Sequence, residues 1–478
     1  MVVKKLNNSF GKGLSRRNFI GQASCAAVGY STLLSSLVNL KAINAAAFAN
    51  SSVNDGDDYK ALVCFMQSGG NDSFQMLLAR SAAEYAEYAS TRSNLAIPQN
   101  EILPIYPVTP DGREFGVHPS MAQVQQLFND RKLAFISNIG TLIDHTNPTD
   151  YYSYQGLPLG LYSHADQIQQ WQTGLPHVRA AQGWGGKVAD LIHDMNLNQD
   201  ISMNVSLAGT NIFQTGQSTI EYALDPYNGS IGIYGYGPTE TWDVFNILRT
   251  QAIDNMLEQE YQDMFKKTYV DVVRKSRDAN LLFQGALEAV PELQTQFTDN
   301  YVSQSFHMVA RTMAARQALG MKRQIFFIDF GGWDHHDEVL QNQLEMLGIV
   351  STALNEFNTA LEELNLSECV TTFTMSEFSR TLTSNGNGTD HAWGANVMVM
   401  GGKVRGGEIF GQFPSLATNG PRVVSDGVLI PTTSTDEYFA EMAMWFGVPK
   451  SDLTTIFPNL GNFYDIGSSN NPIGFLTT

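Results

Sequence analysis

The chain has 478 residues, with 29 Lys or Arg, 47 Asp or Glu and a formal net charge of −18. Residues 1–49 hold six of the 29 basic residues and none of the acidic ones, so the remainder carries a net charge of −24. This acidity argues against nucleic acid or an anionic lipid surface as a partner. Only Cys64 and Cys369 lie beyond residue 49, which excludes a disulfide framework.

The N-terminus has the pattern of an export signal. Basic residues and the motif S-R-R-N-F-I (15–20) precede a mildly apolar stretch and A-A-A-F-A (45–49). Paired arginines before a weakly hydrophobic segment and small residues are typical of a signal read by the twin-arginine export machinery. Gly, Ser and Gln interrupt the apolar run, so a membrane anchor is the weaker interpretation. We expect residues 1–49 to be removed, leaving a periplasmic or secreted protein without a membrane span.

Apolar runs and helical spacing alternate along the rest of the chain. Apolar runs, and at 201–207 the alternation of apolar and polar residues, predict strands, and spacings of three and four predict helices. The predicted strands are 61–66, 133–136, 201–207, 324–330, 370–375 and 397–400; the predicted helices are 118–130 and 338–364. We therefore expect residues 50–478 to form a single domain, with a doubly wound, mostly parallel sheet, helices on both faces and a helical insertion at about 240–320.

Polar clusters follow three of these strands. Q-S-G-G-N-D-S (67–73) follows the first, G-G-W-D-H-H-D-E (331–338) follows the fourth, and S-E-F-S-R (376–380) with N-G-N-G-T-D-H (385–391) follows the fifth. Ligands bind at the carboxyl ends of strands in open α/β sheets. Each cluster alone also fits a solvated turn or a local ion pair, and their shared position is what favours a common site.

Carboxylate and imidazole side chains in these clusters predict a metal site. The candidate ligands are Asp72, Asp334, His336, Glu377, Asp390 and His391. Such a set suits divalent ions, of which zinc, manganese, magnesium and calcium are the candidates. Six ligands exceed what one tetrahedral ion needs, so two ions are plausible.

The same motifs resemble a known family. G-G-N-D, G-W-D-x-H, S-E-F-x-R-T, G-T-D-H-x-W-G and the closing F-P-N-L-G-N-F (457–463) resemble the exported bacterial proteins grouped as domain of unknown function 1501. That family is similar in fold to the alkaline phosphatase and sulfatase superfamily. The resemblance implies a metal site with an early Asp, a hydroxyl or modified Cys nucleophile, and late Asp and His ligands.

Position by position, the resemblance makes Asp72 the early ligand, Asp334 and His336 the late pair, and His391, with Asp390, the final one. Glu377 stands where the superfamily has Asp-His, and here the pair is Glu-Phe. Arg380 would balance the carboxylates or hold an anionic group. Ser163 is the candidate nucleophile, and a helix N-cap is the alternative role for its hydroxyl.

Two classes of function follow. The first is an exported metal-dependent hydrolase of phosphate or sulfate esters, acting on a small anionic ester or a polysaccharide-derived substrate. The second is a non-catalytic extracytoplasmic binding or scaffold protein that retains the fold. A serine esterase of the Gly-x-Ser-x-Gly type is disfavoured because that pentapeptide is absent.

Overall fold

The computed structural model describes residues 58–238 and 242–477. The predicted export signal lies outside the described residues. Within the described part, no helix combines the length and apolar character needed to cross a membrane.

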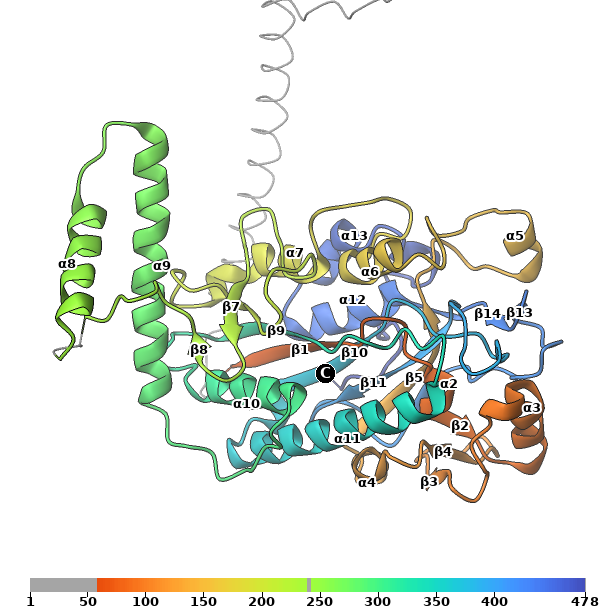
Figure 1. Ribbon diagram of the computed structural model, residues 1–478. Coiled ribbons are helices and arrows are strands. Elements are labelled where there is room, and N and C mark those ends of the chain that lie inside the picture. Colours follow the sequence, from red (N-terminus) through yellow and green to blue (C-terminus); the bar gives the residue numbers. More distant parts are fainter. Residues whose placement is uncertain (1–57, 239–241, 478) are drawn as a thin grey trace, which may run out of the picture. The chain divides into compact units, whose positions relative to one another are not determined.

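A mixed, mostly parallel sheet of ten strands forms the centre (Figure 1). The strand order is β12-β5-β11-β10-β1-β9-β6-β7-β8, with β15 beside β5. β1 pairs in parallel with both β9 and β10, while β11 runs antiparallel to β10 and β5. The strands are β1 (Lys60–Met66), β5 (Leu133–Gly140), β6 (Asn204–Ser206), β7 (Tyr222–Asp225), β8 (Gly229–Ser230), β9 (Arg323–Asp329), β10 (Val370–Met375), β11 (Ala395–Met400), β12 (Ile409–Gly411) and β15 (Thr433–Ser434).

Both faces of the sheet are buried, as the continuous apolar runs predicted. In β1, Val63 and Phe65 belong to one hydrophobic core, and Cys64 and Met66 belong to the other. Successive strand side chains point to opposite faces, so a strand covered on both sides has no polar alternation.

Helices cover the two faces separately (Figure 1). One layer contains α4 (Ala122–Asn129), α10 (Tyr301–Ala314) and α11 (Val339–Glu363). The other contains α6 (His164–Thr173), α7 (Trp184–Ile192), α12 (Thr435–Phe446) and α13 (Leu453–Ile456). The doubly wound α/β architecture is thereby confirmed.

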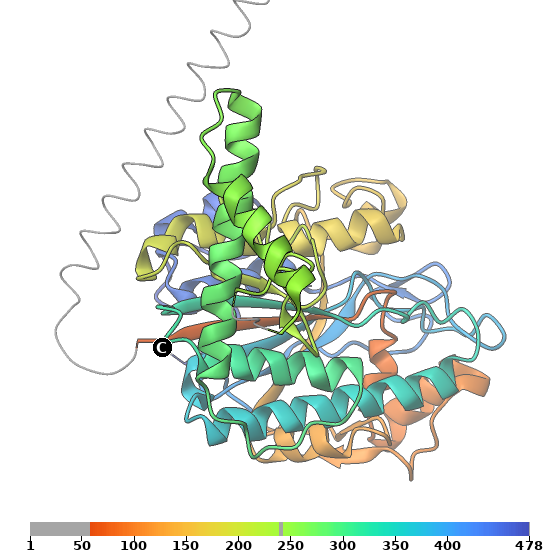
Figure 2. The same ribbon diagram turned by 60° about the vertical axis from the view of Figure 1, so that its left-hand side comes forward.

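Smaller elements lie around this framework. Within the stretch of about 240–320, α8 (Val244–Glu258) and α9 (Met264–Glu288) form an arm that extends from the sheet and its helices (Figures 1 and 2). Beside α3 (Ala82–Arg92), a second sheet joins β2 (Leu77–Ala79), β4 (Phe115–Val117) and β3 (Leu103–Ile105). Other short elements include α2 (Ser73–Met76), α5 (Pro148–Tyr152), β13 (Val423–Val424) and β14 (Val428–Leu429).

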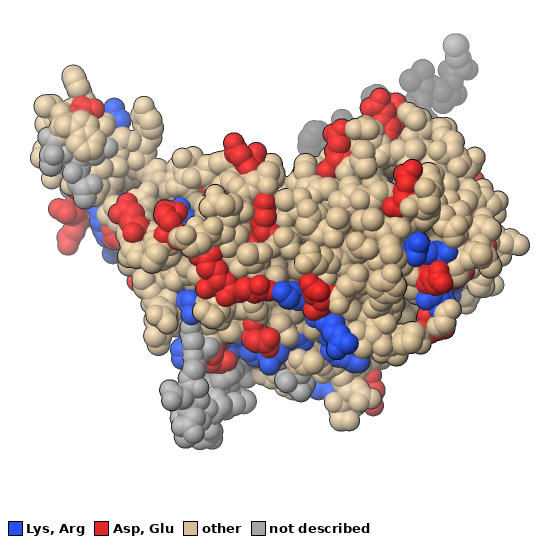
Figure 3. Space-filling model, turned by 90° about the horizontal axis from the view of Figure 1, so that it is seen from below, with Lys and Arg blue, Asp and Glu red and all other residues tan. Residues whose placement is uncertain are grey.

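Acidic and basic side chains are interspersed on the face seen from below (Figure 3). This view looks toward the layer of α4 and α11. Neighbouring charges of opposite sign, where they lie side by side, reduce one another's field.

Candidate metal centre

Three loops meet at one edge of the sheet because β1, β9 and β10 end in register. Met66 pairs with Asp329 on one side and with Met375 on the other. The loop after β1 then crosses the loop after β9 so closely that a Cβ on Gly69 would lie 2.5 Å from the backbone nitrogen of Asp334. Only glycine fits there, which explains Gly69 in the first cluster.

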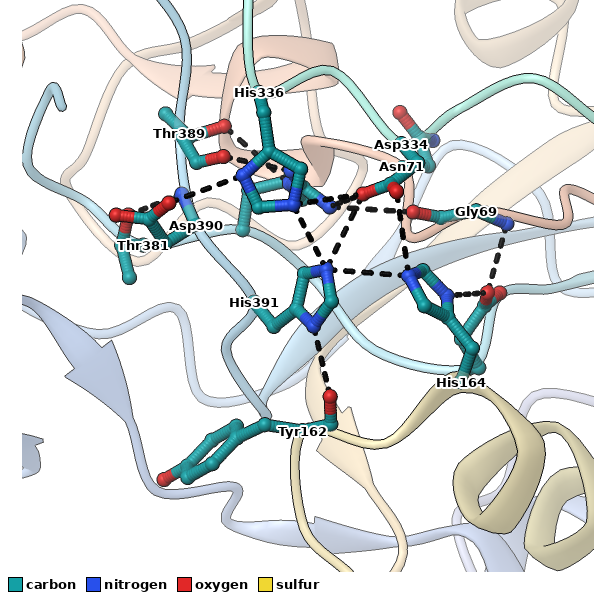
Figure 4. Close-up of polar contacts among 12 residues, drawn as sticks. Gly69, Asn71, Tyr162, His164, Asp334, His336, Thr381, Thr389, Asp390 and His391 are labelled. Atoms are coloured by element: carbon teal, nitrogen blue, oxygen red, sulfur yellow. Dashed lines mark hydrogen bonds and ion pairs between the residues drawn. The ribbon is translucent and has the colours of Figure 1, made fainter. Parts of the chain in front are cut away.

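His164, Asp334 and His391 form a group whose ligand atoms face one another (Figure 4). Nε2 of His164 lies 3.1 Å from Nε2 of His391 and 3.5 Å from Oδ2 of Asp334. Nε2 of His391 lies 3.2 Å from Oδ1 of Asp334. Four donors placed tetrahedrally at zinc–ligand bond lengths would be about 3.3 Å apart. The three distances are therefore those of a donor set that fits a small divalent ion.

His336 adjoins this group. Its Nε2 lies 3.0 Å from Nε2 of His391 and 3.1 Å from Oδ1 of Asp334. Its Nδ1 donates to Oδ1 of Asp390 over 3.0 Å. Asp390 thus supports His336 instead of joining the three-residue group.

The Nδ1 atoms of the other two histidines are also held by acceptors. Nδ1 of His164 donates to Oε1 of Glu377 over 2.8 Å, and Nδ1 of His391 donates to the carbonyl oxygen of Tyr162 over 2.7 Å. A proton held on Nδ1 leaves the Nε2 lone pair for a metal, and carboxylate or carbonyl partners of this kind accompany most metal-bound histidines. The Nε2 atoms of His164 and His336 therefore both lie close to Nε2 of His391.

The surroundings shift the pKa values of these ligands in different directions. The hydrogen bond to Glu377 raises the pKa of His164, while burial lowers that of His391. Burial alone would raise the pKa of Asp334, but the hydrogen bond and charge of Arg380 outweigh it and hold that pKa below its usual value. Asp334 is ionised and His391 favours the neutral form, as ligation requires.

Glu377 and Phe378 position the histidines from behind. Glu377 is fully buried, and its Oε1 also accepts from the backbone N–H of Gly69 over 2.8 Å. The Phe378 ring packs against His164 and His391 with centroids 4.9 and 4.7 Å apart. The Glu-Phe pair thus orients imidazoles, and Glu377 lies outside the three-residue group.

Asp72 also lies outside that group. Its two carboxylate oxygens accept from the Arg92 guanidinium over 2.5 and 2.8 Å, and both side chains are at most 1 % exposed. A guanidinium already neutralises this carboxylate, and the three-residue group found among the described residues does not include Asp72.

Arg380 is buried and is held by protein groups. It donates to Oδ1 of Asp334 over 2.7 Å, to the Thr389 carbonyl over 2.6 Å and to the Gly69 carbonyl over 3.3 Å. It therefore balances the charge of Asp334, the first of the two roles considered for it.

Ser163 is the N-cap of α6, and its Oγ accepts from the backbone N–H of Asp166 over 3.4 Å. The next residue, His164, was not among the residues singled out from the sequence, because it begins a helix and does not follow a strand. The motif Y-S-H-A-D (162–166) contains the one available signal, an imidazole directly after the candidate hydroxyl.

The fold and this group define an α/β protein with a candidate divalent-metal centre at the carboxyl ends of its central strands. The chain belongs to the family described as "Protein of unknown function (DUF1501)", whose pattern matches residues 59–434. The family indicated by the sequence motifs is thereby confirmed. No curated protein matches the sequence.

Solved structures with a similar fold include two determinations of Ps i-CgsB and one of a lipoteichoic acid synthase. Ps i-CgsB in complex with k-i-k-neocarrahexaose is 9% identical, with 84% of this chain and 76% of that chain covered and a TM-score of 0.30. The lipoteichoic acid synthase LtaP from Listeria monocytogenes is 9% identical, with 83% and 80% covered and a TM-score of 0.29. Similarity this low carries no argument about activity or site residues.

Proposed function

We propose that this protein is a metal-dependent hydrolase of phosphate or sulfate esters that holds one divalent ion, zinc by preference, between His164, Asp334 and His391. The observation that supports it is the convergence of two Nε2 atoms and a carboxylate at mutual distances of 3.1 to 3.5 Å. Imidazole nitrogen favours zinc over magnesium or calcium, which prefer all-oxygen sites. A bound divalent ion supplies Lewis-acid polarisation of an ester oxygen.

The chain's own groups would prepare that chemistry. Glu377 and the Tyr162 carbonyl hold two imidazoles in the required tautomer, and Arg380 keeps Asp334 ionised. Ser163 is the hydroxyl proposed as nucleophile, because it directly precedes His164. Its Oγ accepts from the Asp166 N–H over 3.4 Å, and a hydrogen bond from its side chain helps to lower the pKa of the Asp166 carboxyl. The twin-arginine motif supports action in the periplasm or outside the cell, on a small anionic ester or a polysaccharide-derived substrate.

The alternative is a binding or scaffold protein with a structural cation. The burial of Arg380 and the pairing of Asp72 with Arg92 favour it, because both charges are already neutralised by protein groups. Fewer free charges then remain to hold a reacting anion.

Metal analysis followed by an assay of ester hydrolysis distinguishes the hydrolase from the scaffold. We expect about one zinc per chain, release of nitrophenol from nitrophenyl phosphate, its diester or nitrophenyl sulfate, and loss of both in His391→Ala. His177→Ala, which replaces an exposed histidine outside the group, is the matched control. A chain that binds zinc and hydrolyses none of these esters would support the scaffold, and one that takes up no metal would exclude the hydrolase.

A further inference from the structure

A cavity lies next to the metal centre, and Tyr162 contributes to both. The cavity, of about 530 Å³, is lined by Tyr151, Tyr152, Tyr154, Tyr162, the 157–161 segment and Ser425, and we name it the tyrosine pocket. Among the described residues that line it there is no Asp, Glu, Lys, Arg or His. An anionic ester group would find no positive partner there.

Tyr162 belongs to both sites. Its carbonyl oxygen accepts from Nδ1 of His391 over 2.7 Å, and its hydroxyl shares a 2.7 Å hydrogen bond with that of Tyr151. In Figure 4 the carbonyl points to His391 and the ring points away from the imidazoles. The φ of Tyr162 is +72°, a costly conformation for a bulky residue that persists where surrounding contacts enforce it. The pocket and the metal centre are thus tied to one residue.

Two tyrosines of the pocket present large exposed surfaces. Tyr154 is 86% exposed and Tyr152 is 61% exposed. The Tyr152 hydroxyl accepts from the Ser425 N–H over 3.1 Å, which leaves its own proton for a ligand. Each tyrosine therefore offers a flat apolar face with a hydroxyl at its edge.

We propose that the tyrosine pocket binds a neutral sugar ring of a saccharide whose ester group lies at His164, Asp334 and His391. A sugar ring has an apolar C–H face for the tyrosine rings and hydroxyls for the phenols and backbone groups. An alkyl chain could contact the leucines of the 157–161 segment but would offer no hydrogen bond to the Tyr152 and Tyr154 hydroxyls, which is unfavourable where it covers them. The position of the ester rests on the proposed function, whereas binding of the ring does not.

Calorimetric titration of the purified protein with neutral glucose, galactose and mannose hexasaccharides, in α- and β-linkage, tests the pocket directly. We expect at least one to bind, and Tyr154→Ala and Tyr152→Ala each to weaken it about 2- to 10-fold, the usual range for one aromatic contact. Tyr269→Ala, at a tyrosine 71% exposed on α9, is the matched control and should bind as the wild type does.

The proposal is overturned if no hexasaccharide binds, if the Tyr152/Tyr154 double variant binds normally, or if decanoate or adenosine binds more tightly than every saccharide. We expect Tyr154→Ala to fold as the wild type does, because this exposed side chain has no hydrogen bond to another described residue. Weaker sugar binding by this variant would therefore not be explained by misfolding. Titration after chelation separates the two proposals, since sugar binding that persists without the metal does not depend on the hydrolase. If the untreated protein binds sugar but holds no metal and hydrolyses no ester, only the hydrolase is refuted.

Discussion

Nδ1 of His164 and Oε1 of Glu377 lie 2.8 Å apart, which joins the first residue of α6 to a fully buried carboxylate just after β10. This contact fixes the imidazole with its Nε2 toward Asp334 and His391. It also raises the pKa of His164, so a proton competes with the metal for that nitrogen.

Replacing that carboxylate should weaken metal binding. Glu377→Gln keeps the size of the side chain but removes the charge that orients His164, and such changes cost about 10- to 100-fold in affinity. Competition titration with a zinc chelator measures this, and Glu345→Gln, at an exposed position of α11, is the control. Unchanged zinc affinity in Glu377→Gln would show that the contact does not support a metal site.

The Asp72–Arg92 pair should contribute to stability and not to metal content. Asp72→Ala leaves a guanidinium that is 1 % exposed without its partner, which typically costs about 3–5 kcal/mol. Urea unfolding measures the loss. Glu362→Ala removes a pair with Lys132 whose side chains are 46% and 40% exposed, and should cost at most about 1 kcal/mol. A stable Asp72→Ala protein that had lost its metal would restore Asp72 as a ligand.

The centre of the sheet was predictable because β1 and β9 contain continuous apolar runs, a pattern imposed by burial on both faces. Proximity of Asp334 and His391 was predictable for a related reason, since both follow strands that end at one edge. The partner of Asp72 was not predictable, because Arg92 lies 20 residues further along the chain, in α3, and contacts Asp72 only through tertiary packing. His164 was not predicted as a ligand because it lies at the N-terminus of a helix and not at the end of a strand.

Glu437 should make the protein less stable as the pH rises toward neutrality. Burial raises its pKa from 4.5 to about 7. Between these values the folded state keeps a proton that the unfolded chain releases, so this contribution is complete below about pH 4.5 and lost as the pH rises through 7. At roughly 1.4 kcal/mol per pH unit, it amounts to about 3 kcal/mol.

Glu437→Gln should reduce the change in the free energy of unfolding between pH 4.5 and 7, because an amide cannot titrate in this range. The amide oxygen can still accept from the Ser434 N–H. Urea unfolding at pH 4.5, 5.5, 6.5 and 7.5 gives the difference from the wild type. As the control, Glu345→Gln should show the same change in the free energy of unfolding with pH as the wild type. Parallel profiles for Glu437→Gln as well would mean that the buried carboxyl ionises normally.

Ser163→Ala separates the two roles of this hydroxyl. As an N-cap, Ser163 contributes about 1 kcal/mol to stability. As a nucleophile it would also be required for turnover, because no other atom of that residue can attack the ester. We expect Ser163→Ala to bind zinc normally, unfold about 1 kcal/mol more easily and lose ester hydrolysis.

Asn147→Ala provides the comparison, since Asn147 caps α5 through its side chain and is not a proposed nucleophile. It should show a similar loss of stability with nitrophenyl phosphate or sulfate hydrolysis retained. If Ser163→Ala keeps wild-type turnover, the hydroxyl is a cap alone. We then expect water to supply the attacking oxygen, because Oγ of Ser73, the serine that directly follows Asp72, is held 2.9 Å from Oγ of Ser379 and accepts from the Asn396 N–H over 2.8 Å.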